Sequence, residues 1–286
     1  MRKHTMGLLA MAAATTLTLS ACSGADVGGE PGGEDTANGG GGDTIRIGIK
    51  YDQPGLGLQE GEEFTGFDTD VARYVANELG YSEDQIEFVE TISANRETAL
   101  QNGDVDMIFA TYSINDDRKE LIDFAGPYFV AGQDLLVATD NTDITGPADL
   151  EGKNLCSVTG STSAENIKND YAEGVQLVER GGYAECATAL ASGAVDAVTT
   201  DDIILAGLAA AEENAGKFKV VGAPFSEERY GVGLPAESTE RCEEINTAIT
   251  KMIDDGTWEE LVAKNTEGTG YTPNADLNPP EPDACA

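Results

Sequence analysis

Residues 98–106 read TALQNGDVD, and residues 188–196, ninety positions later, read TALASGAVD. Each stretch predicts the end of a helix, a turn at a glycine and an apolar strand that begins with Val-Asp. Strands and helices alternate ahead of both copies, which is typical of α/β proteins with parallel strands. Two α/β lobes of similar build explain the repetition, and a chance match of a common turn is the alternative.

The elements around the two copies follow from hydrophobic periodicity and glycine stops. Strands are predicted at 45–49, 86–89, 105–109, 154–158 and 195–198, and helices at 67–79, 96–101, 164–171 and 243–253. The tail from Thr272 holds four prolines and is expected to be irregular and pinned by Cys285. The pattern predicts mixed, mostly parallel sheets with flanking helices.

Composition excludes several classes of function. The 286 residues hold 17 Lys+Arg against 52 Asp+Glu, a net charge of −35, which argues against a nucleic-acid partner. Hydrophobic residues make up 40%, enough for a packed core. The one histidine is His4, in a segment expected to be removed, so histidine-dependent catalysis and histidine-ligated metal sites are not expected. No GxxxxGK[ST] motif occurs, so we expect no ATP hydrolysis. We also expect no metal and no cofactor.

The N-terminus predicts export. Residues 1–21 carry Arg2 and Lys3, then a short apolar stretch that ends in Leu-Ser-Ala before Cys22, as in a bacterial lipobox. We expect a signal peptide at 1–21, a lipidated Cys22 as the mature N-terminus and a glycine-rich tether at 22–42. Ordinary secretion with a chance cysteine is the alternative.

Four cysteines remain after Cys22. They are Cys156, Cys186, Cys242 and Cys285. In an oxidising compartment they indicate two disulfides, with three possible connectivities. We favour Cys156–Cys186 and Cys242–Cys285, which join neighbours in sequence. Zinc is a poor alternative because no CxxC occurs.

Polar residues follow the predicted strands at the edge where open α/β sheets bind ligands. They are Lys50, Thr111, Ser113, Ser161, Thr162 and Asp201, with Arg118 close behind Ser113. Arg118 has the fork that pairs with a carboxylate, and the helix start at Ser161 offers hydroxyls and free N–H groups. Asp201 suits an ammonium, so the set matches the α-carbon of an amino acid.

Lys50 and Arg96 suit a second carboxylate. Each residue also has an ordinary interpretation. Arg118, Lys50 and Arg96 taken singly fit solvated surface charges, while the hydroxyls at 161–163 and the acids at 201–202 fit simple helix caps. The combination favours a binding site.

The sequence resembles the polar amino-acid-binding proteins of ABC importers, the family 3 extracytoplasmic solute-binding proteins. The matching stretches are 64–70 (FTGFDTD), 103–118, 122–129 (IDFAGPYF) and 194–201. The resemblance covers about 44–265 and implies a two-lobed, type II periplasmic-binding-protein-like α/β fold with a two-strand hinge. Lobe 1 would comprise 43–131 and 228–286, and lobe 2 would comprise 132–227. Ala125-Gly126 depart from the family's Phe-Ser-Asp-Pro-Tyr motif near the first crossover.

Within the family, residues 50–57, 96–98 and 110–115 resemble the glutamate-binding lipoproteins of actinobacterial uptake systems. The resemblance implies that Thr111, Ser113, Arg118 and Thr162, with Ser161 beside them, hold the α-carboxylate and α-ammonium groups. Asp201 would bind the ammonium. Lys50 and Arg96 would bind the side-chain carboxylate, because a buried carboxylate needs charge compensation. Tyr51, Phe67 and Tyr112 are assigned to the pocket walls.

The resemblance implies a monomeric, extracytoplasmic lipoprotein on the outer face of the bacterial cell membrane. It would bind L-glutamate by lobe closure and deliver it to a permease driven by a separate ATPase. Glutamine and aspartate are alternative ligands. A sensor module with the same pocket and a dehydratase-like enzyme are alternative functions. We expect no enzyme, because a dehydratase needs a carboxylate facing the substrate carbon and no candidate stands out.

Overall fold

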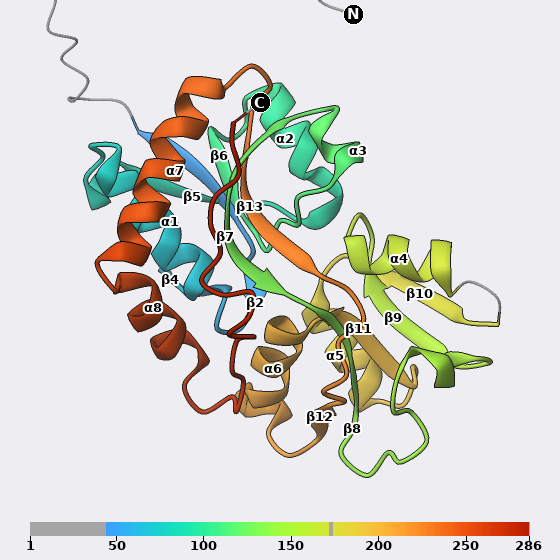
Figure 1. Ribbon diagram of the computed structural model, residues 1–286. Coiled ribbons are helices and arrows are strands. Elements are labelled where there is room, and N and C mark those ends of the chain that lie inside the picture. Colours follow the sequence, from blue (N-terminus) through green and yellow to red (C-terminus); the bar gives the residue numbers. More distant parts are fainter. Residues whose placement is uncertain (1–43, 172–173, 286) are drawn as a thin grey trace, which may run out of the picture. The chain divides into compact units, whose positions relative to one another are not determined.

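The structure is a computed structural model that describes residues 44–171 and 174–285 (Figure 1). The expected signal peptide at 1–21, the lipidated Cys22 and the tether up to residue 42 lie outside these described residues. Across the two described ranges, none of the helices combines the length and the apolar character that a membrane crossing requires.

The first sheet has the strand order β5-β1-β6-β13-β7. Its strands are β5 (Ile86–Glu90), β1 (Ile45–Ile49), β6 (Met107–Phe109), β13 (Glu228–Leu234) and β7 (Asp123–Ala131). β1 pairs in parallel with β5 and β6, whereas β13 pairs antiparallel with β6 and β7. Ile45, Ile47 and Ile49 are all buried, as expected for a strand with neighbours on both sides and packed faces.

The second sheet has the order β10-β9-β11-β8-β12. Its strands are β10 (Gln176–Arg180), β9 (Asn154–Val158), β11 (Ala197–Asp201), β8 (Gln133–Ala138) and β12 (Phe218–Val220). β9 lies parallel to β10 and β11, and β8 lies antiparallel to β11 and β12. Both sheets are mixed, as predicted, but parallel pairs make up only half of the pairings in each. A small antiparallel sheet contains β2 (Asp52–Gln53), β3 (Gly57–Glu60) and β4 (Glu63–Thr65).

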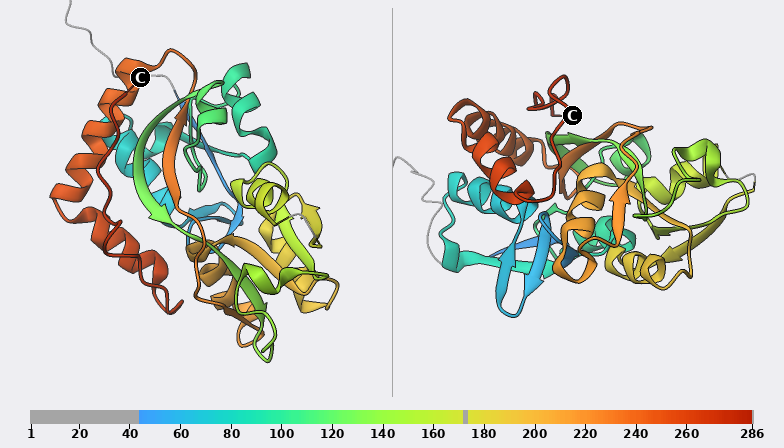
Figure 2. Two further views of the ribbon diagram at one scale, coloured as in Figure 1. Left: turned by 45° about the vertical axis from the view of Figure 1, so that its right-hand side comes forward. Right: turned by 90° about the horizontal axis from the view of Figure 1, so that it is seen from below.

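Helices cover both large sheets. They are α1 (Phe67–Glu78), α2 (Arg96–Asn102), α3 (Asp116–Lys119), α4 (Thr162–Asp170), α5 (Tyr183–Ala191), α6 (Asp202–Ala210), α7 (Thr239–Asp254) and α8 (Thr257–Thr266). Short 3₁₀ turns are η1 (Glu83–Gln85), η2 (Ser93–Asn95), η3 (Pro147–Leu150) and η4 (Glu212–Asn214). α1, α7 and α8 lie together on one side of the first sheet (Figure 2). The repeated stretches end α2 and α5, and their strands begin two residues later than predicted, at Met107 and Ala197.

The chain crosses between the two sheets twice. β7 ends at Ala131, and β8 begins at Gln133 after the single residue Gly132, so the two strands run on from one sheet into the other (Figure 1). The return runs from β12 through residues 221–227 to β13, which pairs with β7. The division into lobes 43–131 with 228–286 and 132–227 stays a prediction, which these two crossings support.

An aromatic cluster packs against the crossing strands on the first-sheet side. Its members are Phe67, Tyr128, Phe129, Tyr230 and Trp258. The rings of Phe129 and Trp258 stack with centroids 6.0 Å apart, and the indole N–H donates to the Tyr128 carbonyl at 2.8 Å. Large aromatic rings pack rigidly when they are buried and their polar atoms are hydrogen-bonded. The cluster therefore fixes β7 and β13 on the side of the first sheet.

The C-terminal tail is irregular, as predicted, and it is fixed at several points. The Asn278 side chain pairs with both the N–H and the carbonyl of Val130, at 2.9 and 2.8 Å. Cys285 is bonded to Cys242 of α7, and Cys156 of β9 is bonded to Cys186 of α5. Both predicted disulfide pairings are therefore confirmed.

Candidate functional site

The predicted polar residues lie where strands of the two sheets end. Lys50 follows β1, Thr111 follows β6 after one residue, and Asp201 is the last residue of β11. Ser161 lies shortly after β9, at the start of α4. Carboxyl ends of parallel strands share one edge of a sheet, so the pattern brings these residues to the edges that face each other.

Arg118 links the two edges. Its guanidinium donates to the Ser113 carbonyl at 2.5 Å and to the Gly160 carbonyl at 3.1 Å. Glu97 lies 3.3 Å from its Nε. The Asn115 side chain caps α3 by accepting from the Arg118 N–H at 2.9 Å, which fixes where the side chain leaves the backbone. Arg118 is thus a buried, pre-oriented cation between the ends of β6 and β9.

Arg96 also contacts the Tyr112 ring. Its Cζ is 4.0 Å from the ring centroid, and that of Arg118 is 4.9 Å from the same centroid. Arg96 donates to the carbonyls of Ala110 and Gly160 at 3.1 and 3.3 Å. Its Nε–H is buried with no hydrogen-bond partner among the described residues. Burial, and then the charge of Arg118, lower the pKa of Arg96 to about 10.

Lys50 is buried next to this pair. Only 4% of the residue is exposed, and its Nζ donates to the Ser93 hydroxyl at 2.7 Å. Burial, followed by the charge of Arg96, lowers the pKa of Lys50 well below its usual value. A buried cation with no carboxylate bonded to it is costly, and an anion beside it offsets that cost. Lys50 and Arg96 therefore form a local cationic site.

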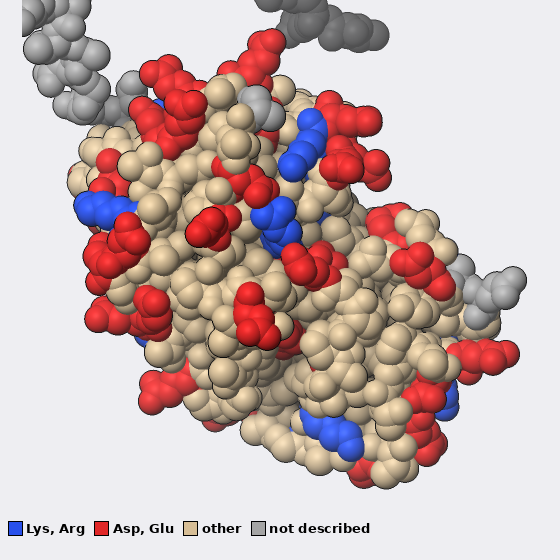
Figure 3. Space-filling model, in the orientation of Figure 1, with Lys and Arg blue, Asp and Glu red and all other residues tan. Residues whose placement is uncertain are grey.

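This cationic site contrasts with the outer surface. Acidic side chains spread over the face shown in Figure 3, and basic ones are few there. That distribution agrees with the net charge of −35. Because Lys50, Arg96 and Arg118 are buried, their charges act at short range inside the molecule rather than as a surface patch. The described residues contain no group of His, Cys, Asp and Glu side chains arranged to hold a metal ion.

Thr111 is held in an unusual backbone conformation. Its φ of 45° is in the left-handed region, which a β-branched residue rarely adopts. Its N–H donates to Asp68 Oδ2 at 2.7 Å, and the Tyr128 hydroxyl donates to Asp68 Oδ1 at 2.7 Å. Burial raises the pKa of Asp68 to about 6, although these bonds and the charge of Lys50 oppose the rise. Asp68 thereby fixes the peptide that presents the Thr111 side chain.

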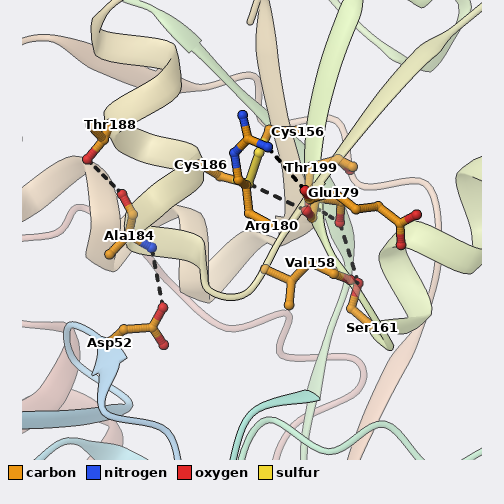
Figure 4. Close-up of a disulfide and its surroundings, with 11 residues drawn as sticks. Asp52, Cys156, Val158, Ser161, Glu179, Arg180, Ala184, Cys186, Thr188 and Thr199 are labelled. Carbon is orange, nitrogen blue, oxygen red and sulfur yellow. Dashed lines mark hydrogen bonds between the residues drawn. A yellow bond between two sulfur atoms is a disulfide. The ribbon is translucent and has the colours of Figure 1, made fainter. Parts of the chain in front are cut away.

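The start of α4 faces the cations. The Ser161 hydroxyl accepts from the Ala164 N–H at 3.0 Å and donates to the Val158 carbonyl at 2.7 Å. The helix begins at Thr162, two residues earlier than predicted, because Ser161 caps it. Figure 4 shows the bond from Ser161 to Val158 in the surroundings of the Cys156–Cys186 disulfide, with Asp52 accepting from the N–H of Ala184 at 3.4 Å.

Two acidic side chains, Glu228 and Asp201, contact the start of α4. The Thr162 hydroxyl donates to Glu228 Oε2 at 2.8 Å and lies 3.4 Å from the Ser113 hydroxyl. Asp201 accepts from the Tyr230 hydroxyl at 2.6 Å. Burial, and then the charge of Glu228, raise the pKa of Asp201 well above its usual value. The site therefore has a cationic side and an anionic side.

Two of the predicted wall residues make other contacts. The Tyr51 hydroxyl donates to the Phe88 carbonyl at 2.9 Å, and its ring lies 5.3 Å from that of Phe64. Phe67 is fully buried in the aromatic cluster. Of the three assigned wall residues, Tyr112 is the one whose ring contacts the arginines.

Known proteins resemble this chain in sequence. Residues 45–267 match the family described as bacterial extracellular solute-binding proteins, family 3. The chain belongs to this family. It is 46% identical over 233 residues to the glutamate-binding protein GluB of Corynebacterium efficiens, covering 78% of each chain. It is 38% identical over 225 residues to the ABC transporter glutamine-binding protein GlnH of Bacillus subtilis, covering 78% of this chain and 81% of the relative.

The likeness extends to solved structures. An ancestral arginine-binding protein bound to arginine superimposes with a TM-score of 0.71 at 34% identity, covering 77% of this chain and 97% of that chain. The predicted fold class, a two-lobed α/β fold of the type II periplasmic binding-protein kind, is thus confirmed for this family 3 solute-binding protein.

Sequence reasoning missed several residues of the site in this solute-binding protein. They are Asp68, Ser93, Tyr183 and Glu228. Burial, and then the charge of Asp201, raise the pKa of Tyr183 to about 12. Asp68 lies in a stretch that carried the resemblance, but no periodicity or spacing assigned it a role. Glu228 follows the second crossing, and only its tertiary contacts reveal it.

Proposed function

We propose that this solute-binding protein binds an amino acid with a second, side-chain carboxylate, and that the ligand is L-glutamate. The observation that carries the proposal is the pair of buried cations, Lys50 and Arg96, beside the α-amino-acid set of Arg118 and Asp201. The 46% identity to the glutamate-binding GluB adds independent support.

Arg118 binds the α-carboxylate in this proposal. Its fork allows two parallel hydrogen bonds to a carboxylate, and the free N–H groups at the start of α4 add further donors. Thr111 and Ser113 supply polar groups from the end of β6. Ser161 acts mainly by capping α4, because its hydroxyl already donates to the Val158 carbonyl. Asp201 and Thr162 receive the α-ammonium group.

Lys50 and Arg96 bind the distal carboxylate. Both are buried, repel each other and have lowered pKa values, so an anion between them relieves a cost that is already present. The unpaired Nε–H of Arg96 provides a donor for it. A neutral amide offsets neither charge, which is the basis for preferring glutamate to glutamine.

Binding closes the two lobes around the ligand in this proposal. Gly160 already contacts both arginines across the sheets, so closure has a defined end point. The closed protein then delivers glutamate to a membrane permease with a separate ATPase. A lipid on Cys22 holds the protein at the outer face of the membrane, and the protein performs no catalysis.

Glutamine is the second candidate ligand, because the chain is also 38% identical to the glutamine-binding GlnH. Lys50→Gln separates the two. It removes the charge but keeps a polar group, so glutamate affinity should fall about 10- to 150-fold, the equivalent of 1.5–3 kcal/mol for a charged hydrogen bond. Glutamine affinity should change by less than about threefold. Calorimetric titration with both ligands measures the two values.

Lys217→Gln is the matched control, because it removes the same charge from an exposed position. It should leave both affinities unchanged. Equal losses for glutamate and glutamine in Lys50→Gln would remove the distal-carboxylate role.

A further inference from the structure

We infer that Glu228 is a positioning residue that fixes the Thr162 hydroxyl as a hydrogen-bond acceptor, so that the site requires an α-ammonium group on its ligand. The inference rests on the proposed function, since it concerns how the same site recognises an amino acid.

Glu228 is the first residue of β13, directly after the second crossing between the sheets. It is 4% exposed and makes three side-chain contacts. Oε2 accepts from the Thr162 hydroxyl at 2.8 Å, while Oε1 accepts from the Ser226 hydroxyl at 2.8 Å and from the Asn166 amide at 3.3 Å. A strand of one sheet thus holds the first turn of a helix that covers the other.

The contact with Thr162 decides the direction of hydrogen bonding. A hydroxyl has one proton and two lone pairs. A carboxylate accepts only, so the proton of the Thr162 hydroxyl points at Glu228 and its lone pairs face other groups. The Ser113 hydroxyl, 3.4 Å away, is therefore the donor of that pair. Toward a ligand, the Thr162 hydroxyl accepts, which suits an ammonium group and not a carboxylate.

A second acid, Asp201 at the end of β11, is contacted in a similar way, and one of its donors is Tyr230, two residues after Glu228 on β13. Tyr230 donates to Asp201 Oδ2 at 2.6 Å, and Ser163, next to Thr162, donates to Oδ1 at 3.5 Å. Tyr230 and Glu228 point to the same side of the strand, because side chains alternate along a strand. Two consecutive residues of α4 therefore direct their hydroxyl protons to two separate acids.

The two acids also repel each other. The charge of Glu228 contributes to the raised pKa of Asp201, together with burial and the charge of Asp202, and Arg96 opposes them. A cation that contacts Asp201 and the Thr162 oxygen offsets both the free-energy cost of burying the Asp201 carboxylate and its repulsion by Glu228. A ligand without the ammonium group forgoes this gain even when both its carboxylates fit.

Glutarate tests the inference, because it keeps the two carboxylates of glutamate and lacks the ammonium. The refolded, ligand-free full chain should bind glutamate at least about 100-fold more tightly than glutarate, or about 2.7 kcal/mol. In Glu228→Gln the amide can donate to the Thr162 oxygen and turn its proton toward the ligand. In this variant, the ratio of glutamate affinity to glutarate affinity should fall at least about tenfold, while the glutarate affinity itself should stay within about threefold of the wild-type value.

Glu227→Gln is the matched control, because it makes the same change one residue away at an exposed position, and its ratio should equal that of the wild type. Equal losses for both ligands in Glu228→Gln, or an unchanged ratio, would overturn the inference. If Glu228→Gln fails to fold, two variants of Thr162 replace it. Thr162→Val should reduce the ratio of glutamate affinity to glutarate affinity, and Thr162→Ser should keep this ratio. Any other order would overturn the inference. A wild-type protein that binds no amino acid refutes the proposed function itself, whereas an unchanged ratio with tight glutamate binding refutes only the role of Glu228.

Discussion

Gly160 follows β9 of the second sheet and contacts Arg96, Arg118 and Ala94 from the part of the chain that builds the first. Its φ is +78°, and its carbonyl accepts from Arg118 and Arg96 at 3.1 and 3.3 Å. A Cβ at this position would lie 2.7 Å from Ala94 Cα and 2.9 Å from Ala94 N. Both are backbone atoms held in η2, so no side chain can move aside to make room.

Gly160→Ala therefore pushes the two edges apart. Ordinary contact begins at 3.4 Å, so relief of the overlap needs a shift of about 0.7 Å. Such a shift lengthens the 3.1 Å bond from Arg118 beyond hydrogen-bonding distance. Loss of a hydrogen bond to a charged group costs about 1.5–3 kcal/mol. If closure is required for binding, glutamate affinity should fall about 10- to 150-fold.

Gly193→Ala is the matched control. Gly193 has a similar φ of +72° but no neighbour within 4 Å of an added Cβ. Both variants should lose about 1 kcal/mol of unfolding free energy from the left-handed conformation, measured by chemical denaturation. Only Gly160→Ala should lose affinity in calorimetric titration. Two results would refute closure onto Ser93 and Ala94. One is an unchanged glutamate affinity in Gly160→Ala, and the other is an equal loss of glutamate affinity in Gly193→Ala.

Two further predictions concern Asp68 and Arg118. The raised pKa of Asp68, from 3.8 to about 6, means that the folded state favours its protonated form, so its contribution to stability is present below pH 3.8 and is lost as the pH rises through 6. Asp68→Asn keeps an acceptor for the Thr111 N–H but does not titrate. Between pH 4 and pH 7, the unfolding free energy of this variant relative to wild type should rise by on the order of 3 kcal/mol, measured by denaturant titration. A difference that does not depend on pH would contradict this prediction. Arg118→Ala removes the bonds to Ser113 and Gly160 and should weaken the affinity for every amino acid more than about 100-fold in calorimetric titration. Arg241→Ala, at an exposed ion pair, is the control and should leave the affinities unchanged. Retained glutamate affinity in Arg118→Ala would rule out the role of Arg118 in binding the α-carboxylate.

Local signals predicted the elements and the disulfides well. The strand at 45–49 and the strand at 154–158 have the predicted bounds, since alternating or buried apolar runs with polar ends are clear in sequence. The repeat around Gly103 and Gly193 is also local, because both glycines adopt the left-handed turn that ends a helix. Cys156–Cys186 and Cys242–Cys285 each close a chain segment that folds within its own region.

The site was predicted less completely, because its second layer is tertiary. Lys50 and Asp201 are conspicuous as charges at strand ends, whereas Arg96 and Arg118 lie in the short helices α2 and α3. The structure brings the three cations together around Tyr112 and Ser93. Glu228 and Asp68 act through partners far away in sequence, Thr162 and Thr111, so no spacing indicates them. Phe67 packs on Trp258 instead of on the cations, because α1 turns its first residue toward α8.

In the proposed function, the buried cations Lys50 and Arg96 select a ligand with a second carboxylate. The most direct measurement is isothermal titration calorimetry of the wild-type protein, unfolded and refolded to remove carried ligand, with L-glutamate and L-glutamine. Glutamate should bind at least about tenfold more tightly than glutamine, a difference of about 1.4 kcal/mol or more. Equal affinities, or tighter binding of glutamine, would contradict the role of Lys50 and Arg96.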